Sequence, residues 1–276
     1  MTWTKPISIA IISAALVLLG ACGDETTADE TQQLNTPVVE TVLTKYSVSV
    51  LHWQTLLPLS GVTLCTNIAG TECTTTDKNG EASFTADMVH GATIQFWGDR
   101  SGFFPFLAEQ VIPGHALDNL EYSPDGTALA DAQFRMVDTS VIDNIVSALD
   151  TQVDESKGHI SVTVLNAGWT SDQDDQVLFI QGAKVTIAEM PEMTPKYLQF
   201  TDPTGNNHFG DEANGTTSDG LAAFFNVDVG THHITVEADG YTCFLGGGQP
   251  SPSGTTAATT KAGRLTYVFV LCEANG

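Results

Sequence analysis

The sequence predicts an all-β protein made of two antiparallel β-sandwiches that follow one another along the chain. Two observations lead to this fold class. Short runs in which apolar and polar residues alternate recur along most of the chain, as in strands with one buried and one solvated face. The same series of strand and turn motifs also occurs twice. One helical pattern lies between the two series, so we expect a short helix to join the sandwiches.

The alternating runs are rich in β-branched residues and are bounded by Gly, Asp and Asn, which is typical of short strands in a sandwich. They lie at residues 46–51, 93–97 and 132–137 in the first half, and at 160–164, 183–187, 234–238 and 265–270 in the second.

Four features of the first half recur in the same order in the second, which indicates two copies of one β-domain. The turn glycines of each copy can take the positive φ that other residues avoid, and Phe84 and Phe224 then point into the two cores. The matching features are strands 47–52 and 161–166, the strands that begin at Gly61 and Gly182, the turns 76–84 and 217–224, and the pairs Gly102-Phe103 and Gly240-Tyr241.

Residues 138–157 contain the one helical pattern. Asp138 or Thr139 can cap the helix, and its apolar stripe has helical spacing. We expect the stripe to pack against the first sandwich, and the segment after it to be a linker. The stripe consists of Val141, Ile142, Ile145, Val146 and Leu149.

The N-terminus has the features of a bacterial lipoprotein signal peptide over residues 1–21. Lys5 precedes an apolar run at 7–21, which is shorter than the roughly 20 residues of a membrane span. The run ends in Leu-Gly-Ala-Cys, so small residues fit a peptidase cleft and Cys22 supplies a thiol for an acyl group such as palmitate. The alternatives are an uncleaved anchor and a buried N-terminal helix.

Residues 22–44 are acidic and lack an apolar period, which predicts a disordered tether that spans on the order of 25 Å. We therefore expect the sandwiches at residues 45–137 and 158–276. The net charge of −23, from 10 Lys and Arg against 33 Asp and Glu, argues against nucleic acid and against anionic lipid as partners.

Four cysteines remain after Cys22, and they allow three disulfide connectivities. Pairing within each half, Cys65 with Cys73 and Cys243 with Cys272, is the economical choice in an oxidising compartment. Free buried thiols are the alternative. The cysteine spacing matches no zinc motif.

The segments Pro-Leu-Ser-Gly-Val-Thr-Leu (58–64) and Thr-Thr-Asp-Lys-Asn-Gly-Glu-Ala-Ser-Phe (75–84) resemble the carboxypeptidase regulatory-like domain, a transthyretin-like β-sandwich. The second copy resembles it through Gly-Ala-Lys-Val (182–185), 219–227 and Ala-Asp-Gly-Tyr (238–241). This resemblance implies an accessory domain that binds, spaces or stabilises. Some such domains are grouped with carbohydrate-binding folds, and the motif brings no catalytic residues.

The second copy departs from the pattern by an insertion at 189–216, since 38 residues separate Gly182 from Gly220 against 19 between Gly61 and Gly80. A loop of this length is unusual unless it is functional or mobile. Its oxygen ligands suit Ca²⁺, although Asp and Asn are also ordinary turn formers. Its aromatic rings can stack on sugars or fold back onto the sandwich. The candidate ligand residues are Tyr197, Phe200, Asp202, Asn206, His208, Phe209 and Asp211.

The remaining polar residues show no catalytic pattern. His232 and His233 alternate across a strand and cannot share a metal, and the sequence has no nucleophile elbow, HExxH or phosphate loop. We therefore expect no catalysis and no cofactor apart from Ca²⁺. The sequence predicts an envelope protein anchored by lipid, with the outer membrane as the expected location. We expect this protein to present β-sandwiches that act as binding or spacer domains, with a glycan or an envelope protein as the partner. A structural stalk or adhesion component is the alternative, and an enzyme of unknown type is the weaker one.

Overall fold

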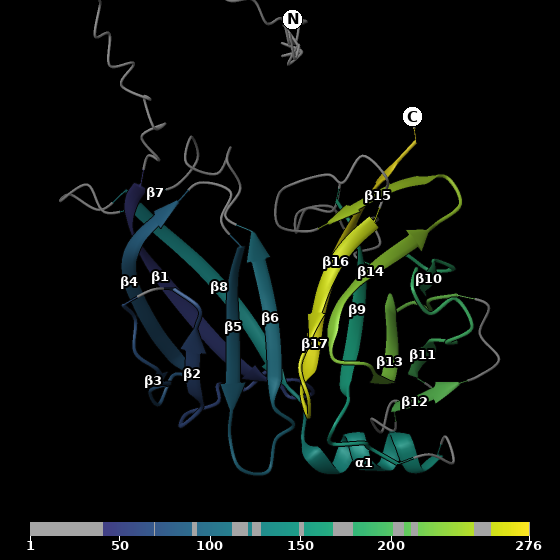
Figure 1. The fold of residues 1–276 in the computed structure, drawn as a ribbon, viewed down its shortest axis with the longest axis horizontal. Helices are drawn as coiled ribbons and strands as arrows, with labels where there is room; N and C mark the ends of the chain where they lie inside the picture. The colour runs from purple at the N-terminus through teal and green to yellow at the C-terminus, as the bar shows by residue number, and fades with distance from the viewer. Residues whose placement is uncertain are drawn as a thin grey trace, which may run out of the picture. The chain divides into compact units, whose positions relative to one another are not determined.

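The computed structural model describes residues 41–68, 70–89, 93–111, 121–122, 128–148, 152–167, 179–200, 207–210, 215–245 and 255–275. Strands dominate this part of the chain, and one helix, α1 (Thr139–Ala148), interrupts them (Figure 1). The predicted all-β class is confirmed. Cys22, the signal peptide and most of the predicted tether lie outside the described residues.

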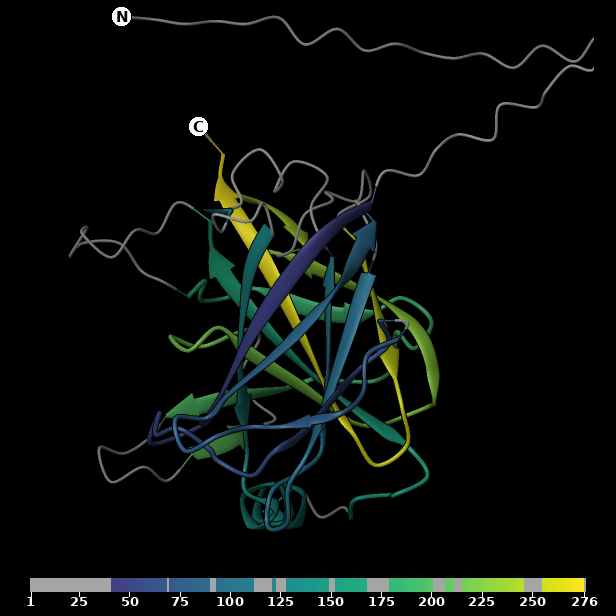
Figure 2. The same ribbon diagram turned by 90° about the vertical axis from the view of Figure 1, so that its left-hand side faces the viewer.

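The first half forms two layers. One has the strand order β4-β1-β8-β7, and the other runs β3-β2-β5-β6. In Figure 2 the purple strand β1 runs alongside β4, its antiparallel partner. The strands are β1 (Thr41–His52), β2 (Thr63–Thr66), β3 (Thr74–Thr75), β4 (Glu81–Val89), β5 (Thr93–Asp99), β6 (Phe106–Val111), β7 (Glu121–Tyr122) and β8 (Ala128–Met136).

The second half repeats this arrangement. One layer has the order β12-β11-β13-β9-β17, with β15 also paired to β17, and the other is β10-β14-β16. The strands are β9 (Gly158–Asn166), β10 (Lys184–Ile187), β11 (Lys196–Phe200), β12 (Asn207–Gly210), β13 (Leu221–Val227), β14 (Gly230–Glu237), β15 (Tyr241–Leu245), β16 (Thr255–Thr260) and β17 (Leu265–Ala274).

The first strand of each half has the same two neighbours. β1 pairs antiparallel with β4 and parallel with β8, whereas β9 pairs antiparallel with β13 and parallel with β17. Tyr46 lies opposite Phe84, as Ile160 lies opposite Phe224. These registers give a residue-by-residue equivalence between the two layers.

The turn before β4 and the turn before β13 are built by the same hydrogen bonds around a buried threonine. The Thr76 hydroxyl donates to the Leu59 carbonyl at 2.7 Å and accepts from the Val62 amide at 2.9 Å. The Thr216 hydroxyl donates to the Ile180 carbonyl at 2.6 Å and accepts from the Ala183 amide at 2.9 Å.

Gly80 and Gly220 close these turns at φ 74° and 58°. A Cβ at either glycine would lie 2.6 Å from a carbonyl oxygen of the first strand, so both positions require glycine. The sequence comparison paired Thr76 with Thr217, whereas the structure pairs it with Thr216. The error is one residue, and it arises because Thr216 and Thr217 are adjacent and alike.

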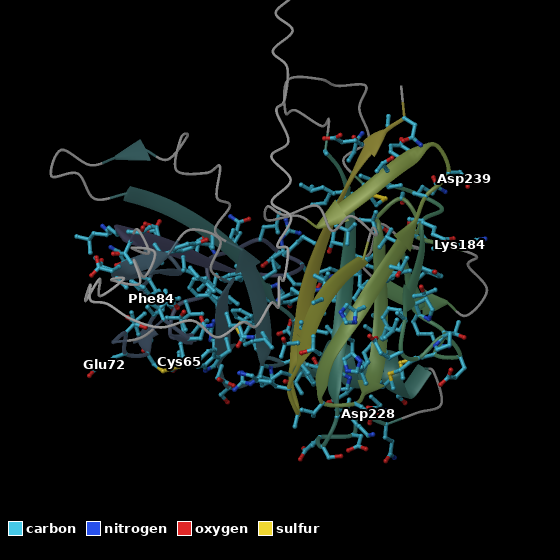
Figure 3. The ribbon with its side chains drawn as sticks, turned by 45° about the horizontal axis from the view of Figure 1, so that its top comes forward. Cys65, Glu72, Phe84, Lys184, Asp228 and Asp239 are labelled. Carbon is cyan, nitrogen blue, oxygen red and sulfur yellow. A yellow bond between two sulfur atoms is a disulfide. The ribbon has the colours of Figure 1, made fainter. Side chains whose placement is uncertain are left out.

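Each half has its own core, and the predicted anchors lie in them. Phe84 is 4% exposed and Phe224 is 1% exposed. Figure 3 labels Phe84 among the side chains of the first half. Each half also contains one disulfide, Cys65–Cys73 and Cys243–Cys272. The pairing within halves is thus the one that the structure adopts.

Two boundaries differ from the sequence prediction. β1 begins at Thr41, so the last four residues of the predicted tether belong to a strand. The insertion at 189–216 was expected to be a loop, but it contains β11 and β12. These strands pair with each other and β11 pairs with β13, so the insertion widens the sheet of the second half.

Helix α1 begins where predicted, but it packs on both halves rather than on the first alone. Its residue Ile142 belongs to a third apolar cluster that contains Phe104 and Val137 from the first half and Leu265 from the second. The Asp138 carboxylate contacts His52 Nε2 at 2.8 Å, which ties the start of the helix to the end of β1.

Candidate functional site

The predicted ligand loop is only partly described, and its described part packs inward. Tyr197 is 6% exposed and belongs to the core of the second half. Its hydroxyl accepts a hydrogen bond from the Val185 amide at 3.3 Å, and burial raises its pKa. Tyr197 is therefore an internal packing residue and is unavailable for stacking on a sugar.

The pairing of β11 with β12 brings three of the other candidate residues onto neighbouring strands, with Phe200 opposite Asn207. Phe200 ends β11, and His208 and Phe209 lie in β12; at these three positions the structure describes the backbone. Asp202, Asn206 and Asp211 lie outside the described residues. Calcium binding by this segment stays a prediction.

Two contacts between Glu189 and His233 fix the start of the insertion against β14. Glu189 accepts a hydrogen bond from the His233 amide at 3.0 Å, and its other carboxylate oxygen contacts His233 Nδ1. These two hydrogen bonds lower the pKa of Glu189 to about 2. On the opposite face of β14, His232 is buried and its Nε2 contacts the Asp228 carbonyl at 2.7 Å. The two rings face opposite ways, as the alternation predicts.

The two halves meet at a junction that the sequence did not predict. Backbone hydrogen bonds, an ion pair and apolar side chains all connect the halves there. β17 pairs in parallel with β6, so strands of both halves belong to one hydrogen-bonded sheet (Figure 1). The Leu265 amide donates to the Pro105 carbonyl at 2.9 Å. Arg264 donates to Asp99 at 3.0 Å and to the Phe106 carbonyl at 3.4 Å.

A fully buried histidine lies in the same region. The ring of His159 packs edge-on against Phe104 at 5.3 Å between ring centroids and also against Phe225 at 5.7 Å. Its Nδ1 accepts a hydrogen bond from the Asn226 amide at 3.2 Å, and its Nε2 has no partner among the described residues. Desolvation lowers its pKa to about 4, so the ring is neutral at physiological pH.

Asn226 connects this histidine to the linker that follows α1. It interrupts β13 at a register shift and has a φ of 59°, a backbone conformation that asparagine tolerates better than most residues. Its side chain donates to the Gln152 carbonyl at 2.9 Å and accepts from the Asp154 amide at 2.9 Å. Sequence reasoning missed Asn226 because an asparagine in a strand gives no distinctive pattern.

The described residues contain isolated charged pairs. Lys157 pairs with Asp228, which raises the pKa of Lys157 and lowers that of Asp228. Within the ranges that the structure covers, no group of three or more His, Cys, Asp or Glu side chains could hold a metal ion. The helix of the described part is too short to cross a membrane.

Comparisons with known proteins give no family. No family model matches the chain, and no curated protein matches it. Solved structures that align with it include the Bacillus anthracis TIE protein, at 13% identity over 84% of this chain and 34% of that one, with a TM-score of 0.25. GBS52, the minor pilin of Streptococcus agalactiae, aligns at 12% identity over 84% and 97%, with a TM-score of 0.26.

The shaft pilin SpaA of Lactobacillus rhamnosus GG aligns at 12% identity over 85% of this chain and 99% of that one, with a TM-score of 0.23. The chain spans about a third of the TIE protein. Superpositions this loose carry no argument about function, so the assignment of two β-sandwiches rests on the strand pairing itself.

Proposed function

We propose that this chain is a non-catalytic cell-envelope spacer or adhesion component, which presents two β-sandwiches as one stiff unit. The observation that supports this most is the pairing of β17 with β6, because it joins the halves by backbone hydrogen bonds. Domains that share only a small interface move relative to one another by default. A protein that needed two independent binding modules would gain nothing from such a joint.

The side chains at the junction support the same conclusion. Leu265 and Phe104 are 5% and 7% exposed, so apolar surface from both halves is removed from water there. The Arg264–Asp99 pair and the cation–π contact of Lys261 with Trp97, 4.8 Å from the ring centroid, flank the shared strands. Bending the two halves apart would break all of these contacts together.

We further propose that Cys22 carries the lipid anchor and that the acidic residues after it form the tether. The cleavage motif and the charge pattern of the sequence support this assignment. We also propose that each sandwich is a carboxypeptidase regulatory-like domain. The duplicated threonine turn around Thr76 and Thr216 favours a common origin of the two halves.

Cell fractionation of the bacterium that carries the gene tests the anchor. We expect Cys22→Ser to move the protein from the membrane to the soluble fraction and to abolish labelling by radioactive palmitate. The matched control is the double variant Cys65→Ser/Cys73→Ser, which removes a described disulfide and should stay in the membrane fraction. Membrane retention of the Cys22→Ser protein would contradict the assignment.

A second experiment separates the spacer from a binding module. Deletion of residues 201–206 should leave attachment of the bacterium to surfaces unchanged, whereas Leu265→Asp, which puts a charge into the junction, should reduce attachment. Leu57→Asp is the matched control, because Leu57 is 63% exposed. A glycan array on which the wild type binds and the 201–206 deletion does not would overturn the spacer proposal in favour of carbohydrate binding.

A further inference from the structure

The outer face of the β9-β13-β17 layer is apolar, although this face lies on the side away from the core of the second half. In a sandwich sheet this face is ordinarily wet and polar. Among its residues, Leu165, Leu221 and Phe269 are partly exposed and belong to none of the three apolar clusters. Phe179, at the end of the same layer, is also partly exposed and unclustered.

These four side chains line a cavity of about 330 Å³ between the layer, helix α1 and the end of β8. The volume lies at the lower end of the range of small-molecule sites, which is roughly 300–1,000 Å³. At roughly 30 Å³ for a group the size of a water molecule, it accommodates on the order of ten heavy atoms. A cavity with apolar walls of this size fits a short hydrocarbon chain.

Arg135 gives the cavity a polar end. It is the one charged residue among the described residues that line the cavity. Among the residues that the structure describes, its guanidinium makes no ion pair or hydrogen bond, whereas Arg264 in the same region is paired with Asp99. A chain with a net charge of −23 repels anions over most of its surface. Arg135 therefore makes the cavity a place where an anionic ligand is attracted.

Tyr267 adds a second polar group to the lining. It lines the same cavity as Arg135. Burial raises the pKa of its phenol and so keeps it protonated, and the Arg135 charge partly offsets that rise. A guanidinium and a neutral phenol are both hydrogen-bond donors to a carboxylate. The described lining contains no Asp or Glu that would compete for them.

We propose that this cavity binds a medium-chain monocarboxylate, with its hydrocarbon chain against Leu165, Leu221 and Phe269 and its carboxylate at Arg135. The guanidinium provides the charge-assisted hydrogen bonds, and the apolar walls select an unbranched chain of about eight carbons. This inference does not depend on the spacer function, because a rigid joint can hold such a site whether or not the protein is anchored.

Isothermal titration of the full chain with sodium octanoate and with 1-octanol, both below their aggregation limits, tests the site. We expect one octanoate per chain. Arg135→Gln should weaken octanoate binding by about tenfold or more, because a hydrogen bond to a charged group is lost, and it should leave 1-octanol binding unchanged. Lys184→Gln, which removes an exposed cation at the far edge of the second half, is the matched control and should change neither ligand (Figure 3).

A second variant tests the apolar part of the site. Thr163→Phe fills the cavity from β9 and should weaken both ligands without lowering the midpoint of thermal unfolding, because Thr163 is only partly buried. Three results would each overturn the proposal. They are no saturable heat with octanoate, equal octanoate affinity in the wild type and Arg135→Gln, and equal losses in Arg135→Gln and Lys184→Gln.

Discussion

The two sandwiches have equivalent interiors, but the outer face of the β1 layer is polar and the outer face of the β9 layer is largely apolar. On the first layer, Ser47, Ser49, Ser83 and Glu81 point away from the core. The strand registers place Ser161, Thr163, Ala223 and Leu221 at the matching positions of the second layer. The contrast is sharpest in the last strand, where Gln133 of β8 corresponds to Phe269 of β17.

This difference shows which part of the sequence determines the fold and which part is free to vary. The buried positions, such as Tyr46 opposite Phe84 and Ile160 opposite Phe224, are large and apolar in both halves. The outer positions determine what each layer contacts. The outer face of the first layer is exposed at Glu81 and Ser83 and borders the cavity only at the end of β8, whereas the outer face of the second packs on α1 and lines the cavity.

The largest expected effect is on the equivalent core anchors. Phe84→Ala and Phe224→Ala should each lower the free energy of unfolding by about 4 kcal/mol, because each leaves a large cavity in a packed core. Urea denaturation followed by circular dichroism measures this. If the halves form one cooperative unit, both variants shift a single transition. Two separate transitions, each sensitive to one variant, would show that the joint is weaker than we infer.

The disulfide of the second half closes a longer loop than the disulfide of the first half. The Cys243–Cys272 bond closes 29 residues and the Cys65–Cys73 bond closes 8. The chain-entropy relation gives about 3.5 kcal/mol for the longer loop and about 2.5 kcal/mol for the shorter one. Replacing both cysteines of each pair by serine, followed by thermal melting, should therefore destabilise the second half more. Equal or reversed losses would contradict this.

The pH dependence of stability should differ between the halves because His159 corresponds to the exposed Lys45. The pKa of His159 is about 4 in the folded chain, against 6.5 for a histidine that is fully exposed to water. As the pH falls below 6.5, His159 binds a proton in the unfolded chain but stays neutral in the folded chain. The free energy of unfolding then decreases by about 3 kcal/mol between pH 6.5 and pH 4.

The matched pair His159→Gln and Lys45→Gln isolates this contribution from the carboxylates that titrate in the same range. Denaturation of each variant between pH 4 and 7 should show a shallower pH dependence for His159→Gln than for the wild type. The Lys45→Gln protein should follow the wild type. An unchanged slope in His159→Gln would show that the buried ring does not control acid stability.

The smallest expected effect concerns the duplicated turn. Thr76→Val and Thr216→Val keep the side-chain shape but leave a buried carbonyl and a buried amide unpaired, which costs about 2 kcal/mol at each site. Thr→Ser at the same positions retains the hydroxyl and should lose less. Thermal melting that ranks serine below valine would mean that the methyl group, rather than the hydrogen bonds, stabilises the turn.

Local sequence pattern predicted most of the strands and the shared architecture of the halves. Alternation identified β5, β9 and β14, and the Asn-Gly and Asp-Gly pairs identified the turns at Gly80 and Gly220. These features depend on neighbours in the chain, so the sequence alone carries them. The four cysteines allow three pairings, and the predicted pairing within each half is confirmed.

The junction could not be predicted because it depends on contacts between distant residues. Nothing near Leu265 indicates that β17 will pair with β6, since the signal for that pairing is an open sheet edge elsewhere in the fold. Phe225 and Phe269 lie on the outer face of their layer and line the cavity, which alternation within one strand does not indicate. The insertion was expected to be a loop because it is rich in proline and glycine, which are typical of turns. Its two strands, β11 and β12, are too short to show a clear alternation.

The position of β17 after all of its partner strands in the sequence also determines the order in which the protein can fold. The first half contains all the strands of its two layers by residue 136, so it can fold while the rest of the chain is still being synthesised. The second half lacks the parallel neighbour of β9 until β17 emerges, and the Arg264 contact with Phe106 spans 158 residues of sequence. Non-local pairings of this kind form slowly. Until then, the free edge of β6 and the apolar face of β9 stay open to chaperones and to misassembly.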